Sequence, residues 1–170
     1  EHNRILNRSE NENGEDFVRR KVQQMQWLAK GLPKNARLTW DIVYVDDGCP
    51  NKSGKLAQDI IKKEKLTAHC QVIWLQDAID KKLEILHGMK STKDSRKGGA
   101  VHYGLWWAQQ NYKSEDSSIV HIVGYTDADL SSHLSLSGII MAPLVANPKN
   151  IISMGARYGD SGVECIPTRP

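Results

Sequence analysis

The sequence predicts an α/β fold built on a mostly parallel sheet with helices on both faces. Two observations lead to this prediction. Segments typical of strands alternate with segments typical of helices, and the expected strands are apolar on both faces, as strands between helix layers are. In such sheets ligands bind beyond the carboxyl ends of the strands, where the polar motifs of this chain also fall. A length of 170 residues with 39% hydrophobic content fits one globular domain.

The chain opens with a polar segment followed by a helix and a strand. Residues 1–13 are polar, and we expect a loop or a frayed end there, with the domain itself spanning 14–170. Apolar side chains recur at helical spacing over 17–28, which predicts an amphipathic helix. Residues 42–45, Ile-Val-Tyr-Val, are typical of a buried strand, and an acidic turn follows them.

The second strand and helix are followed by an irregular segment. Ser53 can cap a helix that runs to Ile61, because apolar residues again recur at helical spacing. Residues 70–75 predict a second buried strand. The polar, lysine-rich segment 77–96 shows no clear pattern, and we expect a mobile loop.

The alternation continues to the end of the chain. Gly98 and Gly99 open an expected helix that extends to Ala108. Residues 119–125 predict a third strand, 134–146 a helix that ends near its internal proline, and 151–154 a fourth strand.

Composition narrows the class of protein. The net charge of +3 arises from 23 basic and 20 acidic side chains, which is too mild to indicate nucleic-acid binding. The three cysteines lack CxxC spacing, so neither a disulfide framework nor a zinc site is indicated, and a reducing compartment is the default. The longest apolar run, 138–146, is too short to span a bilayer. We therefore expect a cytoplasmic protein that can also act at a membrane surface.

Two carboxylates separated by one residue form the clearest chemical motif. Asp127 and Asp129 follow the third expected strand, and side chains at i and i+2 of an extended chain point to the same side. Mg²⁺ or Mn²⁺ takes a few carboxylate oxygens and fills its other positions with water and substrate phosphates. The pair therefore suggests a metal site for a diphosphate. Taken alone, such a pair is more often a solvated acidic turn, because short motifs match by chance.

Two further motifs are suited to binding a nucleotide. Asp46, Asp47 and Gly48 end the first expected strand, where carboxylates can accept hydrogen bonds from a base or a ribose. Lys97 stands before the glycine pair, so cations and helix N–H groups can face phosphate oxygens together. The alternatives are an ordinary turn and a solvated lysine-rich loop.

Four motifs follow one another along the chain: VDDG at 45–48, KGGAVHYGLWWA at 97–108, DADL at 127–130 and GARY at 155–158. In this order they resemble the motifs of family 2 nucleotide-sugar glycosyltransferases, which have the Rossmann-like A-type (GT-A) fold. Within that family, the pattern is most similar to polyprenyl-phosphate sugar transferases such as dolichyl-phosphate mannose or glucose synthases. The resemblance covers about residues 40–169 and implies a metal-dependent, inverting transfer from a UDP- or GDP-linked sugar.

The resemblance also implies roles for individual residues. Asp46 and Asp47 would hold the nucleoside, and Lys97 would lie near the diphosphate. Asp127 and Asp129 would serve the metal and the sugar-phosphate, with Asp129 as a catalytic residue. The residue two positions after Asp129 completes the metal shell in that subgroup, and here it is Ser131, a weaker ligand.

The same resemblance concerns the acceptor. Arg157 matches an arginine that approaches the acceptor phosphate, a second catalytic role, and Arg169 matches a further downstream arginine. A hydroxyl acceptor needs a base to take its proton, whereas a lipid phosphate is already anionic and needs cations to position it. The two arginines favour a polyprenyl phosphate acceptor.

The chain also departs from the family pattern. The first strand of the family, ending in a P-x-Y-N-E type turn, has no clear counterpart, and the acceptor region expected beyond Pro170 is missing from the sequence. These departures leave a second hypothesis: a catalytically silent GT-A domain that binds nucleotide or a partner protein. A sugar-phosphate nucleotidyltransferase is a third, but no glycine-rich G-x-G-T-R type loop is found.

Overall fold

A computed structural model describes residues 2–95, 97–112, 114–147, 149–150 and 152–155. The chain divides into two compact units, Glu1–Ser135 and Leu136–Pro170. The larger unit contains the sheet and every predicted site residue that lies within the described ranges. None of the helices in these ranges has the length and apolar character needed to cross a membrane.

The described part of the larger unit has a short parallel sheet. Strand β1 (Ile42–Asp46) pairs with β2 (Cys70–Trp74), with Ile42 opposite Cys70 and Asp46 opposite Trp74. Both strands were predicted within one residue at each end. Their apolar, β-branched side chains suit a sheet that is covered on both faces.

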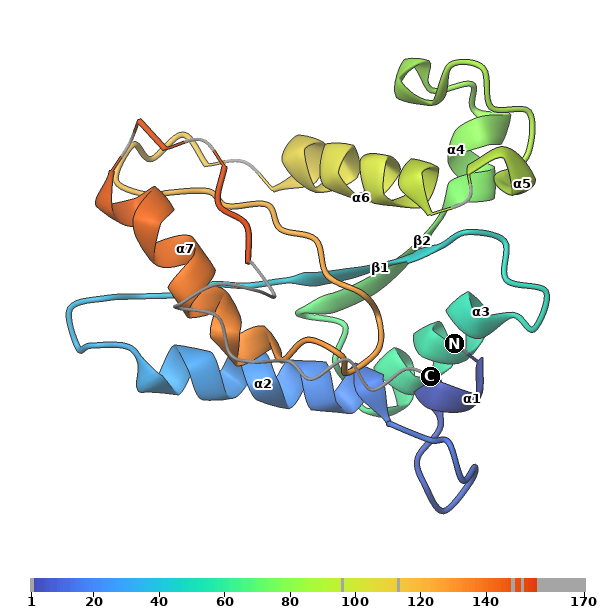
Figure 1. Ribbon diagram of the computed structural model, residues 1–170, viewed down its shortest axis with the longest axis horizontal. Coiled ribbons are helices and arrows are strands. Elements are labelled where there is room, and N and C mark those ends of the chain that lie inside the picture. Colours follow the sequence, from blue (N-terminus) through green and yellow to red (C-terminus); the bar gives the residue numbers. More distant parts are fainter. Residues whose placement is uncertain (1, 96, 113, 148, 151, 156–170) are drawn as a thin grey trace. The chain divides into compact units, whose positions relative to one another are not determined.

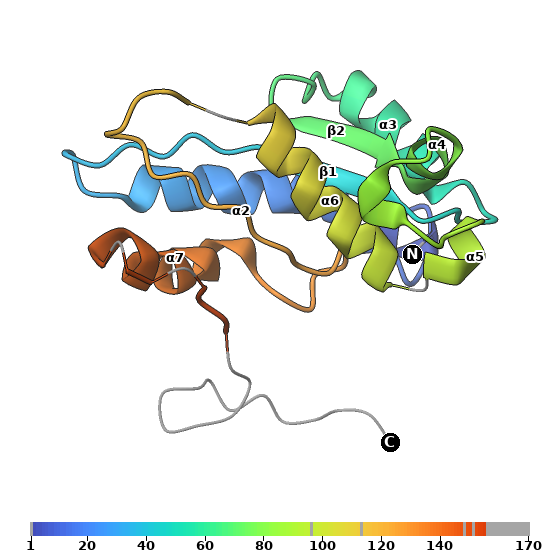
Figure 2. The same cartoon turned by 90° about the horizontal axis from the view of Figure 1, so that it is seen from above.

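Helices cover both faces of this sheet (Figure 1). Helices α1 (His2–Ile5), α2 (Phe17–Gly31) and α3 (Ser53–Lys63) pack on one face. Helices α4 (Leu75–Asp80) and α6 (Gly98–Asn111) pack on the other face, together with the 3₁₀ helix η1 (Glu84–Leu86). Figure 2 shows α6 lying across the strands. The predicted mixed α/β architecture with two helix layers is therefore confirmed.

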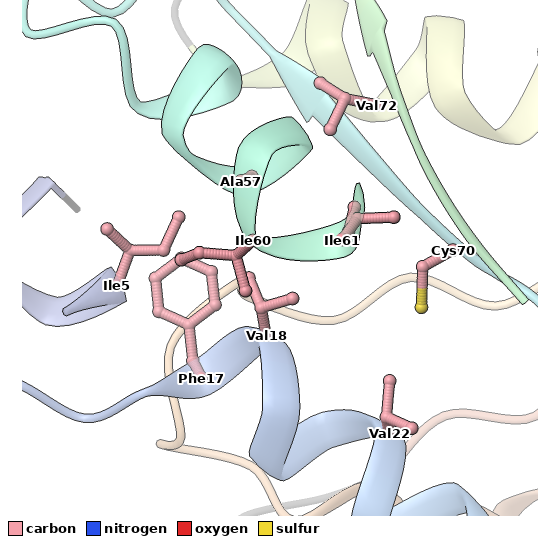
Figure 3. Close-up of a cluster of buried hydrophobic side chains, with 9 residues drawn as sticks. All are labelled: Ile5, Phe17, Val18, Val22, Ala57, Ile60, Ile61, Cys70 and Val72. Carbon is pink, nitrogen blue, oxygen red and sulfur yellow. The ribbon is translucent and has the colours of Figure 1, made fainter. Parts of the chain in front are cut away.

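Alternating strand residues divide the apolar core into two clusters. Tyr44 and Val72 contact the cluster that α1, α2 and α3 form, whereas Val45 and Ile73 contact the other cluster. This alternation follows from the period of two along a strand. In the first cluster, side chains from three helices and β2 point toward one another (Figure 3).

The amino-terminal segment is a short helix followed by a loop, so the expected loop is found over 6–13, whereas the expectation was wrong for residues 2–5. Residues His2–Ile5 form α1, and Ile5 is completely buried in the first core cluster. Backbone N–H groups of Glu15 and Asp16 donate to the carbonyls of Arg4 and Leu6, at 2.9 and 2.8 Å. One buried isoleucine and these hydrogen bonds tie a largely polar segment to the core.

The segment 77–96 was expected to be a mobile loop, and this prediction was also wrong for its described residues. It contains the end of α4, the whole of η1 and helix α5 (Thr92–Ser95). Ala78, Ile79 and Leu86 are buried in the second core cluster. The apolar residues are spaced too irregularly to predict one helix, yet each anchors a short turn.

The third and fourth strands are absent from the described residues. Residues 119–125 form no strand, and Ile119, Val120 and Tyr125 are about half exposed. Residues 152–155 also lack regular structure, and residue 151 lies outside the described ranges. Strand propensity alone therefore did not predict strand formation, because pairing needs a neighbouring strand edge. A complete Rossmann-like sheet is not seen.

The smaller unit contains helix α7 (Ser137–Ala146), which follows the 3₁₀ helix η2 (Leu134–Leu136). Pro143 lies inside α7, so the predicted stop at that proline is wrong by about one turn. Gly155 lies against this helix, since a Cβ built on it would be 3.2 Å from Cδ1 of Ile140. The chain after α7 therefore folds back on the helix.

Candidate functional site

Asp46, at the carboxyl end of β1, binds the backbone of the next helix. Its Oδ2 accepts a hydrogen bond from the Gly54 N–H at 2.8 Å, and its Oδ1 accepts from the Gly48 N–H at 2.9 Å. The Asp46 carboxylate thus lies against the first turn of α3 and binds one of the helix N–H groups that otherwise lack partners. Asp46 therefore holds the acidic turn in shape. This structural role is separate from the nucleoside binding that the sequence predicts for Asp46.

The rest of this turn is narrow and exposed. Gly48 has φ of 90°, and a Cβ at that position would lie 2.4 Å from Oγ1 of Thr92 in α5. The turn therefore requires glycine for two reasons, conformation and space. Asp47 is exposed, so its carboxylate can receive hydrogen bonds from a ligand.

Lys97 and Asp127, both predicted site residues, form an ion pair. The Lys97 Nζ donates to Asp127 Oδ1 at 2.5 Å, and the Tyr125 hydroxyl donates to the same oxygen at 2.6 Å. The Lys97 ammonium also lies 5.5 Å from the centre of the Tyr125 ring. The hydrogen bond from Lys97, and then that from Tyr125, lowers the pKa of Asp127. Asp127 is thus a stable anion near neutral pH.

The start of α6 is partly satisfied from within the protein. Ser95 Oγ accepts a hydrogen bond from the Ala100 N–H at 3.0 Å. A Cβ on Gly99 would lie 2.7 Å from the same Ser95 oxygen and 2.5 Å from Cε of Met89. The glycine therefore permits close packing at the helix start, and one of the N–H groups expected to face a phosphate is already bonded.

Asp129 has a different cation from Asp127. Its Oδ2 accepts from the Arg4 guanidinium at 2.5 Å, and its Oδ1 accepts from the Ser131 N–H at 2.9 Å. Burial alone would raise the pKa of Asp129. Hydrogen bonds from the Ser131 side chain and backbone, together with the Arg4 charge, outweigh burial and lower the pKa to about 2. Ser131 therefore lies beside Asp129, as a shared metal shell would need.

Glu15 joins the amino-terminal segment to residues 127–131, which contain Asp127 and Asp129 and which we call the DxD loop. Its Oε1 accepts from Arg4 Nε at 2.7 Å and from the second Arg4 nitrogen at 2.5 Å. Its Oε2 accepts from the Leu130 N–H at 3.0 Å. One carboxylate thus holds both the arginine that binds Asp129 and the backbone directly after Asp129. Both guanidinium nitrogens donate to the same carboxylate oxygen, which leaves Oε2 for the Leu130 N–H.

Lys21 is a buried cation close to the same carboxylates. Its side chain is on α2, the residue is 1% exposed, and its Nζ has no hydrogen-bond partner among the described residues. Burial lowers the pKa of Lys21, while the negative charges of Asp129, Asp127 and Glu15 act in the opposite direction. We call these charged residues the DxD cluster, with members Arg4, Glu15, Lys21, Lys97, Asp127 and Asp129.

A polar pocket of about 590 Å³ adjoins the DxD cluster. Arg4 and Glu15 belong both to the cluster and to the pocket wall. Asn51, from the turn that follows Asp46 and Asp47, lies on the wall as well. Its other lining residues come from the amino-terminal segment: His2, Asn3, Arg8, Glu12, Asn13 and Gly14. The pocket therefore connects the acidic turn after β1 with the side chains that bind Asp129.

The donor set of the DxD loop suits a hard divalent cation. Asp127 and Asp129 offer carboxylate oxygens, and Ser131 offers a hydroxyl, which are the ligand types that Mg²⁺ and Mn²⁺ accept. Within the described ranges, no three or more His, Cys, Asp or Glu side chains are grouped so that they could hold a metal. The remaining positions of a bound ion would fall to water and phosphate oxygens.

The structure brings some predicted site residues together and adds others. Lys97 meets Asp127, and Ser131 meets Asp129, whereas Arg157 and Arg169 lie outside the described residues. The sequence analysis missed Arg4, Glu15, Lys21 and Tyr125 as site residues. Tyr125 had a usable signal, since it is two residues before Asp127 on the same side of an extended chain. The other three carry no local signal.

No protein-family model, curated protein or solved structure matches this chain. The features that bear on function are therefore the four sequence motifs and the geometry of the DxD cluster and its pocket.

Proposed function

We propose that this chain is a metal-dependent glycosyltransferase domain of the family 2, GT-A type. It would transfer a sugar from a UDP- or GDP-linked donor to an acceptor, with inversion at the sugar carbon. The observation that carries the proposal is the shared use of Arg4 and Glu15, which line the polar pocket and also hold the DxD loop. A ligand in that pocket would extend directly to Asp129.

The size and lining of the pocket are suited to a nucleotide-sugar. Its volume of about 590 Å³ lies within the usual range of small-molecule sites, roughly 300 to 1,000 Å³. Arginine side chains pair with phosphate oxygens, while amide and carboxylate groups read the edges of a base or bind ribose hydroxyls. The wall offers all three kinds of group, including Arg4, Asn51 and Glu12.

The roles of the site residues follow from their positions. Asp127, Asp129 and Ser131 would hold Mn²⁺ or Mg²⁺. When bound, such an ion supplies Lewis-acid stabilisation of the departing diphosphate. Lys97, which is 66% exposed, would donate to phosphate oxygens, and Asp47 would accept from the nucleoside.

The acceptor we propose is a polyprenyl phosphate at a membrane surface. Arg157 and Arg169 would position its anionic oxygen, which needs no base to remove a proton. This part of the proposal depends on the sequence motifs alone, because both arginines lie outside the described residues.

One observation favours the second candidate, a catalytically silent domain that binds nucleotide or a partner protein. Asp127 and Asp129 are already paired with Lys97 and Arg4 at 2.5 Å. If these pairs persist when a ligand binds, the carboxylates have fewer oxygens for a metal. Nucleotide would then still enter the pocket, but transfer would not follow.

Calorimetry with UDP- and GDP-sugars in the presence of Mn²⁺ tests the proposal. We expect binding by the wild-type chain that weakens on Asn51→Ala, because Asn51 lines the pocket. Asn35→Ala is the matched control, since Asn35 is exposed and is not part of the pocket wall. Absence of binding to a folded chain would refute the transferase and the nucleotide-binding form of the second candidate.

Turnover separates the two candidates. Release of UDP or GDP is measured with polyprenyl phosphate supplied, before and after chelation of the metal. Metal-dependent release that is lost in Asp129→Ala supports the transferase. Binding of the nucleotide-sugar without release, in the full-length chain with acceptor present, supports the silent domain.

A further inference from the structure

Two arginines and two glutamates line the polar pocket, and one residue of each kind is already engaged. Arg4 and Glu15 pair with each other and with the DxD loop. Arg8 and Glu12 also lie on the pocket wall, are exposed, and have no hydrogen-bond or ion-pair partner among the side chains of the described residues. A ligand in the pocket therefore meets one guanidinium and one carboxylate that are open for binding.

The two open groups are close in sequence and opposite in charge. Arg8 and Glu12 are four positions apart on the loop 6–13, yet no ion pair joins these two described residues. Arginine donates hydrogen bonds and has no acceptor, whereas an ionised carboxylate only accepts. Phosphate oxygens would suit Arg8 but would be repelled by Glu12. The pair thus fits a ligand group that has acceptors on one side and donors on the other.

Among the nucleobases, guanine has this pattern. Its N7 and O6 are neighbouring acceptors that arginine binds with two hydrogen bonds, and its N1–H and N2–H₂ are neighbouring donors that a carboxylate can accept together. Uracil has a single N–H between two carbonyl oxygens, which a carboxylate would repel. Adenine and cytosine place an amino group beside a ring nitrogen that accepts. A carboxylate therefore finds two adjacent donors only on guanine.

We infer that the pocket is specific for a guanine nucleotide, with Glu12 accepting from N1–H and N2–H₂ and Arg8 donating to N7 and O6. This inference rests on the proposed function, which leaves the choice between UDP- and GDP-linked donors open. Arg4 joins the pocket to Asp129, so the diphosphate would lie at Arg4 and the base farther along the wall. The family resemblance covers residues 40–169 and assigns no role to Arg8 or Glu12.

Calorimetry with GDP, inosine diphosphate and UDP, each with Mn²⁺, tests the inference without measuring turnover. The three ligands have the same ribose and diphosphate, so their affinity ratios report on the base. Inosine diphosphate differs from GDP only in lacking the 2-amino group. For the wild-type chain we expect GDP to bind about tenfold or more tightly than either of the other two, as for loss of a hydrogen bond to a charged group.

Variants of the loop 6–13 separate the two contacts. Glu12→Gln replaces two acceptor oxygens by one acceptor and one donor, so the preference for GDP over inosine diphosphate should fall to about threefold or less. Arg8→Gln should weaken GDP and inosine diphosphate alike, because both have N7 and O6, and should leave UDP unchanged. Glu10→Gln is the matched control: Glu10 is on the same loop but not on the pocket wall, and glutamine keeps an acceptor for the Asn7 N–H.

Several outcomes would overturn the inference. UDP binding as tightly as GDP would do so and would leave the transferase proposal standing, since a UDP-linked sugar would still enter the pocket. Equal affinities for GDP and inosine diphosphate, an unchanged ratio in Glu12→Gln, or equal weakening of all three ligands in Arg8→Gln would also overturn it. Selective binding of GDP without its release from a GDP-sugar would support the inference and refute the transferase. No binding of any of the three would overturn both.

Discussion

The ion pair and hydrogen bonds of Asp129 predict a specific acid sensitivity of the folded chain. In Asp129→Asn the side chain keeps its size but loses its charge, so Arg4 and Ser131 lose an anionic acceptor. The pKa of Asp129 in the folded chain is about 2, below its ordinary value of 3.8. A carboxyl group with a lowered pKa stabilises the folded state above its unfolded pKa and loses this effect as the pH falls.

The magnitude follows from the pKa difference. A shift from 3.8 to about 2 corresponds to about 2.4 kcal/mol at about 1.36 kcal/mol per unit. The Arg4 side chain is 33% exposed and solvent screens the pair, so we expect about 1 kcal/mol. The wild type should therefore exceed Asp129→Asn by about 1 kcal/mol above pH 5. The difference should shrink between about pH 4 and pH 2.

Urea unfolding at pH 7, 5, 4 and 3 measures this difference. Asp59→Asn is the matched control, because the Asp59 side chain is 55% exposed and pairs with Lys55 on the surface of α3. Its free energy of unfolding should differ little from that of the wild type at every pH. Parallel curves for the wild type and Asp129→Asn down to pH 3 would refute the reasoning, because they would show no coupling between folding and protonation of Asp129.

The remaining predictions concern stability. Glu15→Gln should lower the free energy of unfolding by about 1.5–3 kcal/mol, because it weakens the charged hydrogen bonds from Arg4 and from the Leu130 N–H. Additive effects of Glu15→Gln and Arg4→Gln in a double-mutant cycle would contradict this prediction. Lys21→Met should raise the thermal midpoint, as it removes a buried ammonium without a hydrogen bond; a lower midpoint would show that the charge is needed for folding. Gly54→Ala should lower the free energy of unfolding, measured in urea, by about 1–3 kcal/mol, because the new Cβ would lie 2.5 Å from an oxygen of the Asp46 carboxylate. A urea midpoint equal to that of the wild type would refute this prediction.

The spacing of apolar residues along the sequence was enough to predict two strands and two helices. The strands at 42–46 and 70–74 and the helices at 17–31 and 53–63 have apolar residues at the period of their own element. The period reflects one buried face, so it can be recognised without knowing the partner.

Tertiary contacts decided what local pattern could not. Residues 119–125 have strand-like composition but gain no strand partner in the described residues, and residues 77–95 fold into short turns around single buried side chains. Arg4 and Asp129 are 125 positions apart, and Glu15 and Leu130 are 115 apart. A contact between residues so distant in sequence depends on how α1, α2 and the sheet pack.

The sequence by itself thus determined the α/β class, the first two strands and the acidic DxD motif. Only the tertiary structure decided that Lys97 pairs with Asp127, that Arg4 pairs with Asp129, and that Lys21 lies buried near both carboxylates. The physical reason is that hydrophobic periodicity is a local property of the chain, whereas charge compensation depends on which distant side chains the packed core brings within a few ångströms.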